Sequence, residues 1–164
     1  MVSAKPRYYE TYETIKYPAG DVPAAYGVCT DLIIRSFRSA NIDLQQLLHE
    51  DRVKNPAAYP REIWDNKKPD ANIDHRRCQN LAVFLSRRAT SLTTSLATDK
   101  LSLWQPGDVV FFVKKNAKHP WHVAIISSKN DADGVPLISH LFPPHARTDR
   151  LDEFGPIHSH FRWE

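Results

Sequence analysis

Hydrophobic side chains recur every three or four residues in three segments of the chain, the spacing at which they share one face of an α-helix. In the first segment Leu32, Ile33 and Phe37 form such a stripe. The second segment begins with Asp43 and has Gln46 three residues later, a pattern typical of a helix N-terminus. We therefore predict helices over residues 29–40, from residue 44 onward, and over residues 74–88.

After the turn sequence Pro106-Gly107-Asp108, the apolar positions form short runs rich in β-branched and aromatic residues. A cluster of Asn, Asp and Gly at 130–134 separates two of these runs, as expected for a hairpin. Helices followed by an antiparallel sheet predict the α+β class. The predicted strands are residues 109–113, 122–128, 135–141 and 158–163.

The first 26 residues differ in composition from the rest of the chain. They hold five of the six tyrosines, together with Pro6, Pro18 and Pro23. This composition predicts an extended arm or a short irregular helix. A length of 164 residues fits one domain, so we expect residues 1–164 to form a single domain whose residues 1–26 are a tyrosine-rich arm.

Glycine and cysteine usage excludes several classes of site. No two of the five glycines are closer than seven positions. This spacing excludes the glycine-rich phosphate loops and the nucleophile elbow of serine hydrolases. The two cysteines, Cys29 and Cys78, do not form a C-x-x-C motif, so the common zinc templates are absent. We therefore expect neither a cofactor nor a metal ion.

Charge and hydropathy narrow the range of partners. The formal net charge is +3 and the basic residues occur in pairs, so we expect no nucleic-acid partner. The longest apolar run is five residues, whereas a membrane-spanning helix needs roughly 20. Residues 1–20 lack the apolar segment of a secretory leader. We expect no integral membrane segment and no signal peptide in the chain as given.

Cys29 is the first candidate for chemistry. It opens a predicted helix, where the helix dipole and the unpaired amides stabilise a thiolate, so it is a plausible nucleophile. The alternative is that Cys29 packs in the core beside Leu32 and Ile33. Cys78 lies within a predicted helix on an apolar stripe, which favours core packing. A disulfide between the two cysteines stays open as an alternative.

Two histidines lie at the same end of the predicted hairpin. His122 begins one strand and His140 ends the next, and a register centred on the turn places them directly opposite each other. They could then serve as a base and as the group that orients it. The alternative is that each is a partly buried residue at a strand end. His158 and His160 share a strand face and are a weaker candidate for binding a metal ion.

Several short motifs occur in the order found in a known family. Through these motifs, the chain resembles an uncharacterised bacterial branch of the NlpC-type papain-like cysteine peptidases over residues 17–163. It departs from the best-known members in having Cys29-Thr30-Asp31 where they carry an Asp-Cys-Ser run. The motifs are Gly27-Val28-Cys29-Thr30-Asp31, Asn72-Ile73-Asp74-His75-Arg76, Pro106-Gly107-Asp108, His122-Val123-Ala124-Ile125 and His160-Phe161-Arg162-Trp163.

The resemblance implies a papain-like fold in which N-terminal helices pack on an antiparallel β-sheet. It implies that Cys29 is the nucleophile, His122 the base and His140 the orienting residue. It also implies hydrolysis of an amide bond in peptidoglycan stem peptides through a thioester acyl-enzyme. We expect Asp31 and Tyr26, which flank Cys29, to support the nucleophile or to bind substrate beside it.

Two other functions remain open at this stage. The same residues could serve a deamidase, protease or acyltransferase that acts on a substrate outside the wall. The protein could instead be a non-catalytic module that binds wall polymer or metal. Since peptidoglycan lies outside the cytoplasm, we expect a secreted or periplasmic site of action. Without a leader, export as an antibacterial toxin would require a cognate immunity protein in the producer.

Overall fold

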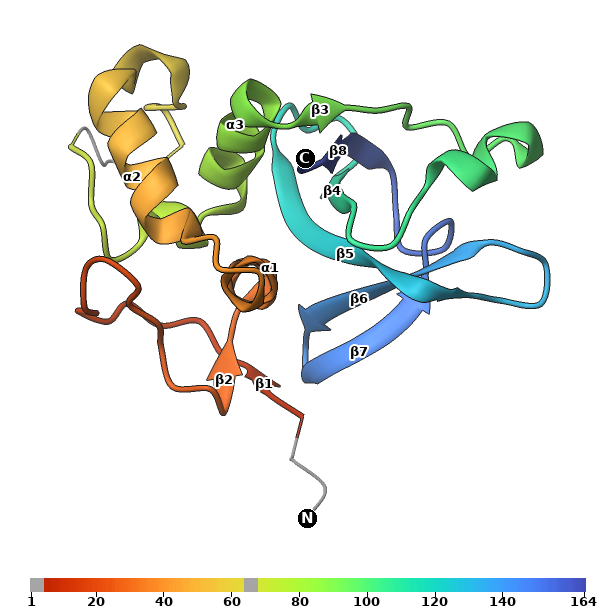
Figure 1. Cartoon of the computed structure of the whole chain (residues 1–164), viewed down its shortest axis with the longest axis horizontal. Coiled ribbons are helices and arrows are strands. Elements are labelled where there is room, and N and C mark those ends of the chain that lie inside the picture. The colour runs from red at the N-terminus through yellow and green to blue at the C-terminus, as the bar shows by residue number, and fades with distance from the viewer. Residues whose placement is uncertain (1–4, 64–67) are drawn as a thin grey trace.

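The computed structural model describes residues 5–63 and 68–164 (Figure 1). Eight strands form one sheet in the order β2-β1-β7-β6-β5-β4-β8-β3. The pairing is antiparallel except between β1 and β2, which run parallel. The strands are β1 (Arg7–Tyr8), β2 (Tyr26–Gly27), β3 (Thr90–Ser91), β4 (Val109–Val113), β5 (Pro120–Asn130), β6 (Pro136–Phe142), β7 (His145–Arg150) and β8 (Ile157–Arg162).

The helical segments are short and lie before β4 in the sequence. None of the helices in the described part of the chain is long and apolar enough to cross a membrane. Three are α-helices: α1 (Cys29–Ser39), α2 (Leu44–Lys54) and α3 (Cys78–Arg88). The others are the 3₁₀ segments η1 (Pro56–Ala58), η2 (Asp74–Arg76) and η3 (Thr98–Leu103).

The expected fold class is wrong. The structure is not a papain-like arrangement of N-terminal helices on an antiparallel sheet, but a large mixed sheet of eight strands with few helices. Strands β1 and β2 come from the N-terminal arm and join this sheet before the first helix begins (Figure 1). Apolar periodicity could not predict these strands because each has only two residues.

The predicted hairpin forms, but its register differs by two residues. Ile125 pairs with Ser139 and Ile126 with Ile138, so continuing this register places Ala124 opposite His140. The irregularity lies between Ile126 and Asn130, close to the turn. A shift of two residues keeps every side chain on the face predicted for it, whereas a shift of one would reverse the faces.

The third predicted helix is interrupted. Residues 74–76 form the 3₁₀ segment η2, and Arg77 has extended backbone angles before α3 begins at Cys78. The start of α2 is as predicted, because the Asp43 carboxylate accepts hydrogen bonds from the amides of Gln45 and Gln46. The break at Arg77 places Cys78 in the first turn of a helix instead of its middle.

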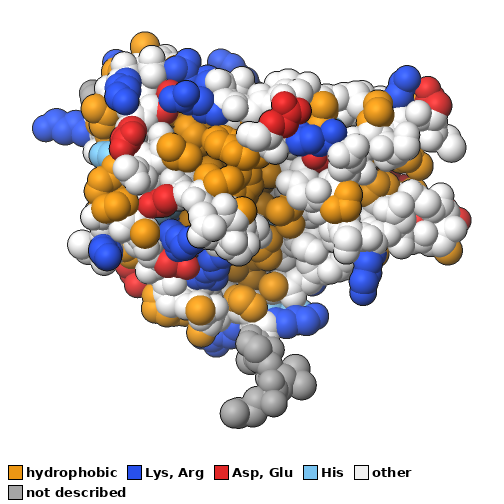
Figure 2. All heavy atoms as spheres, viewed as in Figure 1, with side chains coloured by type: hydrophobic (Ala, Val, Ile, Leu, Met, Phe, Trp, Pro, Cys, Tyr) orange, Lys and Arg blue, Asp and Glu red, His pale blue; other side chains and the backbone are white. Residues whose placement is uncertain are grey.

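The core lies on both faces of β4. Val109 and Phe111 pack with residues of the three α-helices, while Val110 and Phe112 pack into a second cluster on the opposite face. This alternation follows from the period of two along a strand, and it explains why the whole strand is apolar. Figure 2 shows hydrophobic side chains gathered near the middle of the face in view, around α3.

Candidate active site

Cys29 is the first residue of α1 and is buried, with 7% of its surface exposed. It lines a cavity of about 490 Å³ beside α3 and β5. Gly27 lies two residues before Cys29. A β-carbon at this position would lie 2.6 Å from Oδ2 of Asp31. A side chain at position 27 would therefore displace the carboxylate that holds this turn.

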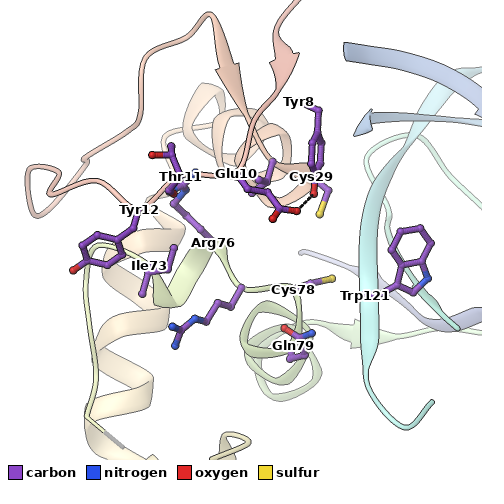
Figure 3. Close-up of a pocket in the computed structure, with 12 residues that line it drawn as sticks. Tyr8, Glu10, Thr11, Tyr12, Cys29, Ile73, Arg76, Cys78, Gln79 and Trp121 are labelled. Carbon is purple, nitrogen blue, oxygen red and sulfur yellow. Dashed lines mark hydrogen bonds between the residues drawn. The ribbon is translucent and has the colours of Figure 1, made fainter. Parts of the chain in front are cut away.

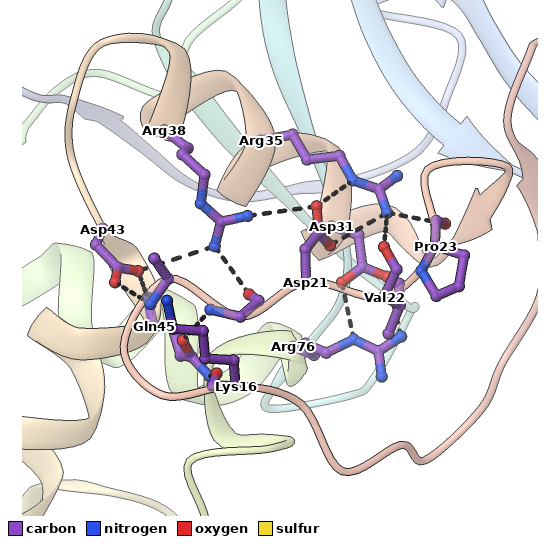
Figure 4. A network of polar contacts seen from close by, with 12 residues as sticks. Lys16, Asp21, Val22, Pro23, Asp31, Arg35, Arg38, Asp43, Gln45 and Arg76 are labelled. Atoms are coloured by element: carbon purple, nitrogen blue, oxygen red, sulfur yellow. Dashed lines mark hydrogen bonds and ion pairs between the residues drawn. The ribbon is translucent and has the colours of Figure 1, made fainter.

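Asp31 fixes the start of α1 rather than lining the cavity. Its Oδ2 accepts a hydrogen bond from the amide of Val28 at 2.7 Å. Both of its oxygens pair with the guanidinium of Arg76, at 2.8 and 3.0 Å (Figure 4). Both side chains are about 2% exposed, and such a buried, two-fold contact gives a strongly defined geometry. Asp31 thus holds the backbone on which Cys29 lies.

The surroundings of Cys29 lower the pKa of its thiol to about 5. The largest cause is a hydrogen bond with Cys78, and burial opposes it by raising the pKa. A hydrogen bond with His122, its charge, and the amide of Val123 lower the pKa further. A thiolate is the reactive form of cysteine, and the lowered pKa favours this form of Cys29.

The two predicted histidines are in contact. Nε2 of His122 lies 2.8 Å from Nδ1 of His140, and both side chains are buried. Because Nε2 of His122 faces His140, its Nδ1 remains for the interaction with Cys29. The structure therefore brings Cys29, His122 and His140 into one continuous group.

Asp149 extends this group and was missed in the sequence. Its Oδ2 lies 3.0 Å from Nε2 of His140 and also accepts a hydrogen bond from Nε of Arg147 at 2.8 Å. Asp149 and Arg147 lie on β7, which has no apolar run and gave no strand signal. The signal that could have revealed this strand is Pro143-Pro144, which forms a two-residue connection after β6.

The contact with Asp149 determines which ring nitrogens of His140 and His122 carry a proton. A carboxylate only accepts hydrogen bonds, so Nε2 of His140 carries the proton. Burial, with the charge of His122, lowers the pKa of His140 to about 4 despite the opposing effect of Asp149. A neutral His140 then has a lone pair on Nδ1, which accepts the Nε2 proton of His122. His122 is left with Nδ1 free to exchange a proton with Cys29.

Aromatic rings enclose the two histidines. Phe142 stacks on His140, with ring centroids 5.9 Å apart, and meets His122 edge-on at 5.4 Å. Phe154 lies 4.7 Å from both imidazoles. These rings keep water from the imidazoles, which strengthens the hydrogen bonds between them.

Tyr8 and Trp121 both line the cavity (Figure 3). The hydroxyl of Tyr8 donates a hydrogen bond to Glu10 at 2.9 Å. Burial, this hydrogen bond and the charge of Cys29 raise the pKa of Tyr8, so it remains a neutral phenol. Tyr26 points elsewhere, because its hydroxyl donates to Glu13 at 2.6 Å and its ring packs edge-on against Tyr9. The arm therefore contributes Tyr8 to the cavity, rather than the expected Tyr26.

Cys78 packs in the buried core cluster, as predicted, but it also lines the cavity and does not lie in the middle of a helix as its apolar stripe indicated. It is the first residue of α3, and both cysteines are free thiols. Burial, with the hydrogen bond to Cys29 and the charge of Cys29, raises the pKa of Cys78 well above its usual range. The surroundings therefore shift the pKa values of the two thiols in opposite directions, lower for Cys29 and higher for Cys78.

The histidines of β8 have separate roles. His160 bonds to the carbonyl of Thr93 and to Asp108, at 2.8 Å each. His158 bonds to the hydroxyl of Ser159. Over residues 5–63 and 68–164, no three His, Cys, Asp or Glu side chains are grouped so as to hold a metal ion.

Comparison with known proteins identifies relatives of the whole chain. The chain is 43% identical over 156 residues to the Uncharacterized protein YijF of Escherichia coli (strain K12), a match that covers 95% of this chain and 73% of that protein. No solved structure matches it. A family described as Domain of unknown function (DUF1287) matches residues 1–163. The chain therefore belongs to the DUF1287 family.

Proposed function

We propose that the protein is a cysteine hydrolase that cleaves an amide bond in the stem peptides of bacterial peptidoglycan. The observation that carries the proposal is the continuous series of contacts from the Cys29 thiol through His122 and His140 to Asp149. A nucleophile, a base and a group that orients the base are the parts that acyl transfer requires. The series lies beside a cavity of about 490 Å³, so substrate can reach the sulfur.

The first step forms a thioester. The Cys29 thiolate attacks the amide carbonyl, and unpaired amides in the first turn of α1 stabilise the oxyanion. As the C–N bond breaks, His122 donates a proton from Nδ1 to the leaving amine. His140 and Asp149 hold the ring of His122 in the orientation that this transfer needs.

The second step releases the acyl group. His122, now neutral, takes a proton from water at Nδ1, and the resulting hydroxide equivalent attacks the thioester carbonyl. The C–S bond breaks, and Cys29 leaves as the thiolate that its surroundings stabilise. The products are a carboxylic acid and an amine, and the enzyme returns to its starting state.

Peptidoglycan is proposed as the substrate because the ordered motifs around Cys29 and His122 resemble those of NlpC-type cysteine peptidases. This substrate places the site of action outside the cytoplasm. We propose that the protein acts there as a secreted antibacterial effector, and that a cognate immunity protein protects the producing cell.

The test is digestion of purified sacculi, with the released fragments identified by mass spectrometry. The wild-type protein is expected to release peptides with new termini, and Cys29→Ala and His122→Ala are expected to release none. His145→Ala is the matched control, since this histidine is exposed and bonds to the neighbouring carbonyl of Ala146. Release of peptides by Cys29→Ala would refute the role of Cys29 as the nucleophile. A wild-type protein that is inactive on sacculi but hydrolyses other amides would show that peptidoglycan is not the substrate.

A further inference from the structure

Both cysteines of the protein open a helix, and the two helix starts meet at one cavity. Cys29 is the first residue of α1 and Cys78 the first residue of α3, each helix having 11 residues. Both sulfur atoms point into the cavity, as Figure 3 shows. Both residues are 7% exposed, so the pair is largely buried and is reached through the cavity.

Two contacts fix the distance between these helix starts. The hydroxyl of Thr30, next to Cys29, donates a hydrogen bond to the carbonyl of Arg76 at 2.8 Å. The guanidinium of Arg76 pairs with both oxygens of Asp31. The segment that leads into Cys78 is thereby attached to the first turn of α1, so the two sulfurs are held in place from both sides.

The two sulfurs differ in the groups that act on their ionisation. Cys29 interacts with His122 and with the amide of Val123, which favour its anionic form. Burial and Cys29 itself act on Cys78, and both raise its pKa and favour its neutral form. A thiol beside a thiolate is a hydrogen-bond donor, and such a donor stabilises the anion.

We propose that Cys78 is a positioning residue, whose thiol donates a hydrogen bond to the Cys29 sulfur and holds it as a thiolate aimed into the cavity. This role rests on the proposed function of Cys29 and adds a residue to the site. A packing residue at position 78 would need only the right volume. The proposed role needs a donor atom as well.

The test measures the rate of alkylation of Cys29 by iodoacetamide against pH, under reducing conditions, with each cysteine followed separately by mass spectrometry. Cys78→Ala removes the donor and Cys78→Ser keeps one. Leu81→Val, one turn further along α3 and fully buried, is the matched control for looser packing. Circular dichroism confirms the fold of each variant.

In the wild type the rate should rise through a pKa of about 5. Cys78→Ala should raise this pKa by about one unit or more, which lowers the rate near the wild-type midpoint by roughly five- to tenfold. Cys78→Ser should lie close to wild type, and Leu81→Val should match it. An unchanged profile in Cys78→Ala, or equal shifts in Cys78→Ala and Leu81→Val, would overturn the role of Cys78. An ordinary pKa for Cys29 in the wild type would instead refute the activated nucleophile itself.

Discussion

His122 and His140 share a hydrogen bond of 2.8 Å although they are not direct partners across the hairpin. Their strands pair in a register that places the two residues two positions apart, on one face of the sheet. Diagonal neighbours at this offset lie within reach of long or aromatic side chains. The contact links His122, which acts on Cys29, to the carboxylate of Asp149 through His140.

Asp149→Asn should lower the rate of peptide release by roughly tenfold to a hundredfold. The amide can present its NH₂ group to Nε2 of His140, which favours the wrong tautomer of that ring and weakens its contact with His122. Initial rates on soluble stem peptides measure the effect. Asp133→Asn, on an exposed turn, is the control. Equal rates for Asp149→Asn and wild type would show that His140 needs no carboxylate.

Peptide release should increase with pH through an acid limb near pH 5, because the pKa of Cys29 is lowered to about 5 and the thiolate forms above it. The pKa of His140 is lowered to about 4, so this ring is already neutral in that range. Initial rates at saturating and at low substrate concentration give the profile. A limb near the ordinary thiol value of about 8.5 would contradict an activated Cys29.

Asp108→Asn should lower the free energy of unfolding by about 2 to 4 kcal/mol. The buried carboxylate of Asp108 binds His160 and Arg162, and the substitution removes the negative charge that pairs with the guanidinium of Arg162. Denaturant titration measures the change. The exposed Asp133→Asn should change the stability by less than about 0.5 kcal/mol.

The contribution of Asp108 to the free energy of unfolding should also depend on pH. Burial alone would raise its pKa, but hydrogen bonds from His160, Arg162 and the amide of Gln105 outweigh this and lower it to about 2. A lowered carboxyl pKa stabilises the fold fully above about pH 4, and that contribution fades as the pH falls towards about 2. The difference between wild type and Asp108→Asn should shrink over this interval. A constant difference would contradict the assignment to the charged form.

Export to the periplasm of a Gram-negative host, through an added leader, should lyse cells that express the wild type. Cytoplasmic expression at the same level should not, because peptidoglycan lies outside the inner membrane. Cys29→Ala with the same leader is the control for growth defects that export of the protein causes by itself. Optical density and microscopy follow lysis. Equal lysis by Cys29→Ala would show that toxicity is independent of the nucleophile.

The sequence predicted those parts of the site that depend on local signals. Val109–Val113 is the strand expected from its apolar run, and α1 begins at Cys29 as its stripe indicated. Asp149 could not be found in this way, because β7 is polar and is held in place by pairing with β6. Its position depends on the register of three strands rather than on residues nearby in the chain.

Cys78 illustrates a second limit of the sequence. Its apolar neighbours at helical spacing predicted a continuous helix, and nothing in that period reveals the extended conformation of Arg77. The break results from tertiary contacts, among them the pairing of Arg76 with Asp31 and its hydrogen bond to the carbonyl of Thr11. The mixed sheet was missed for a similar reason, since β1 and β2 are too short to show a period.

The central claim is that Cys29 becomes acylated during turnover, and trapping the thioester tests it most directly. Wild-type protein is mixed with soluble stem peptides, quenched in acid within the first turnovers, and analysed by intact and peptide mass spectrometry. We predict one added acyl group, located on Cys29 and lost after incubation at neutral pH. Cleavage that proceeds with no adduct on Cys29, or an adduct that forms equally in Cys29→Ala, would contradict the mechanism.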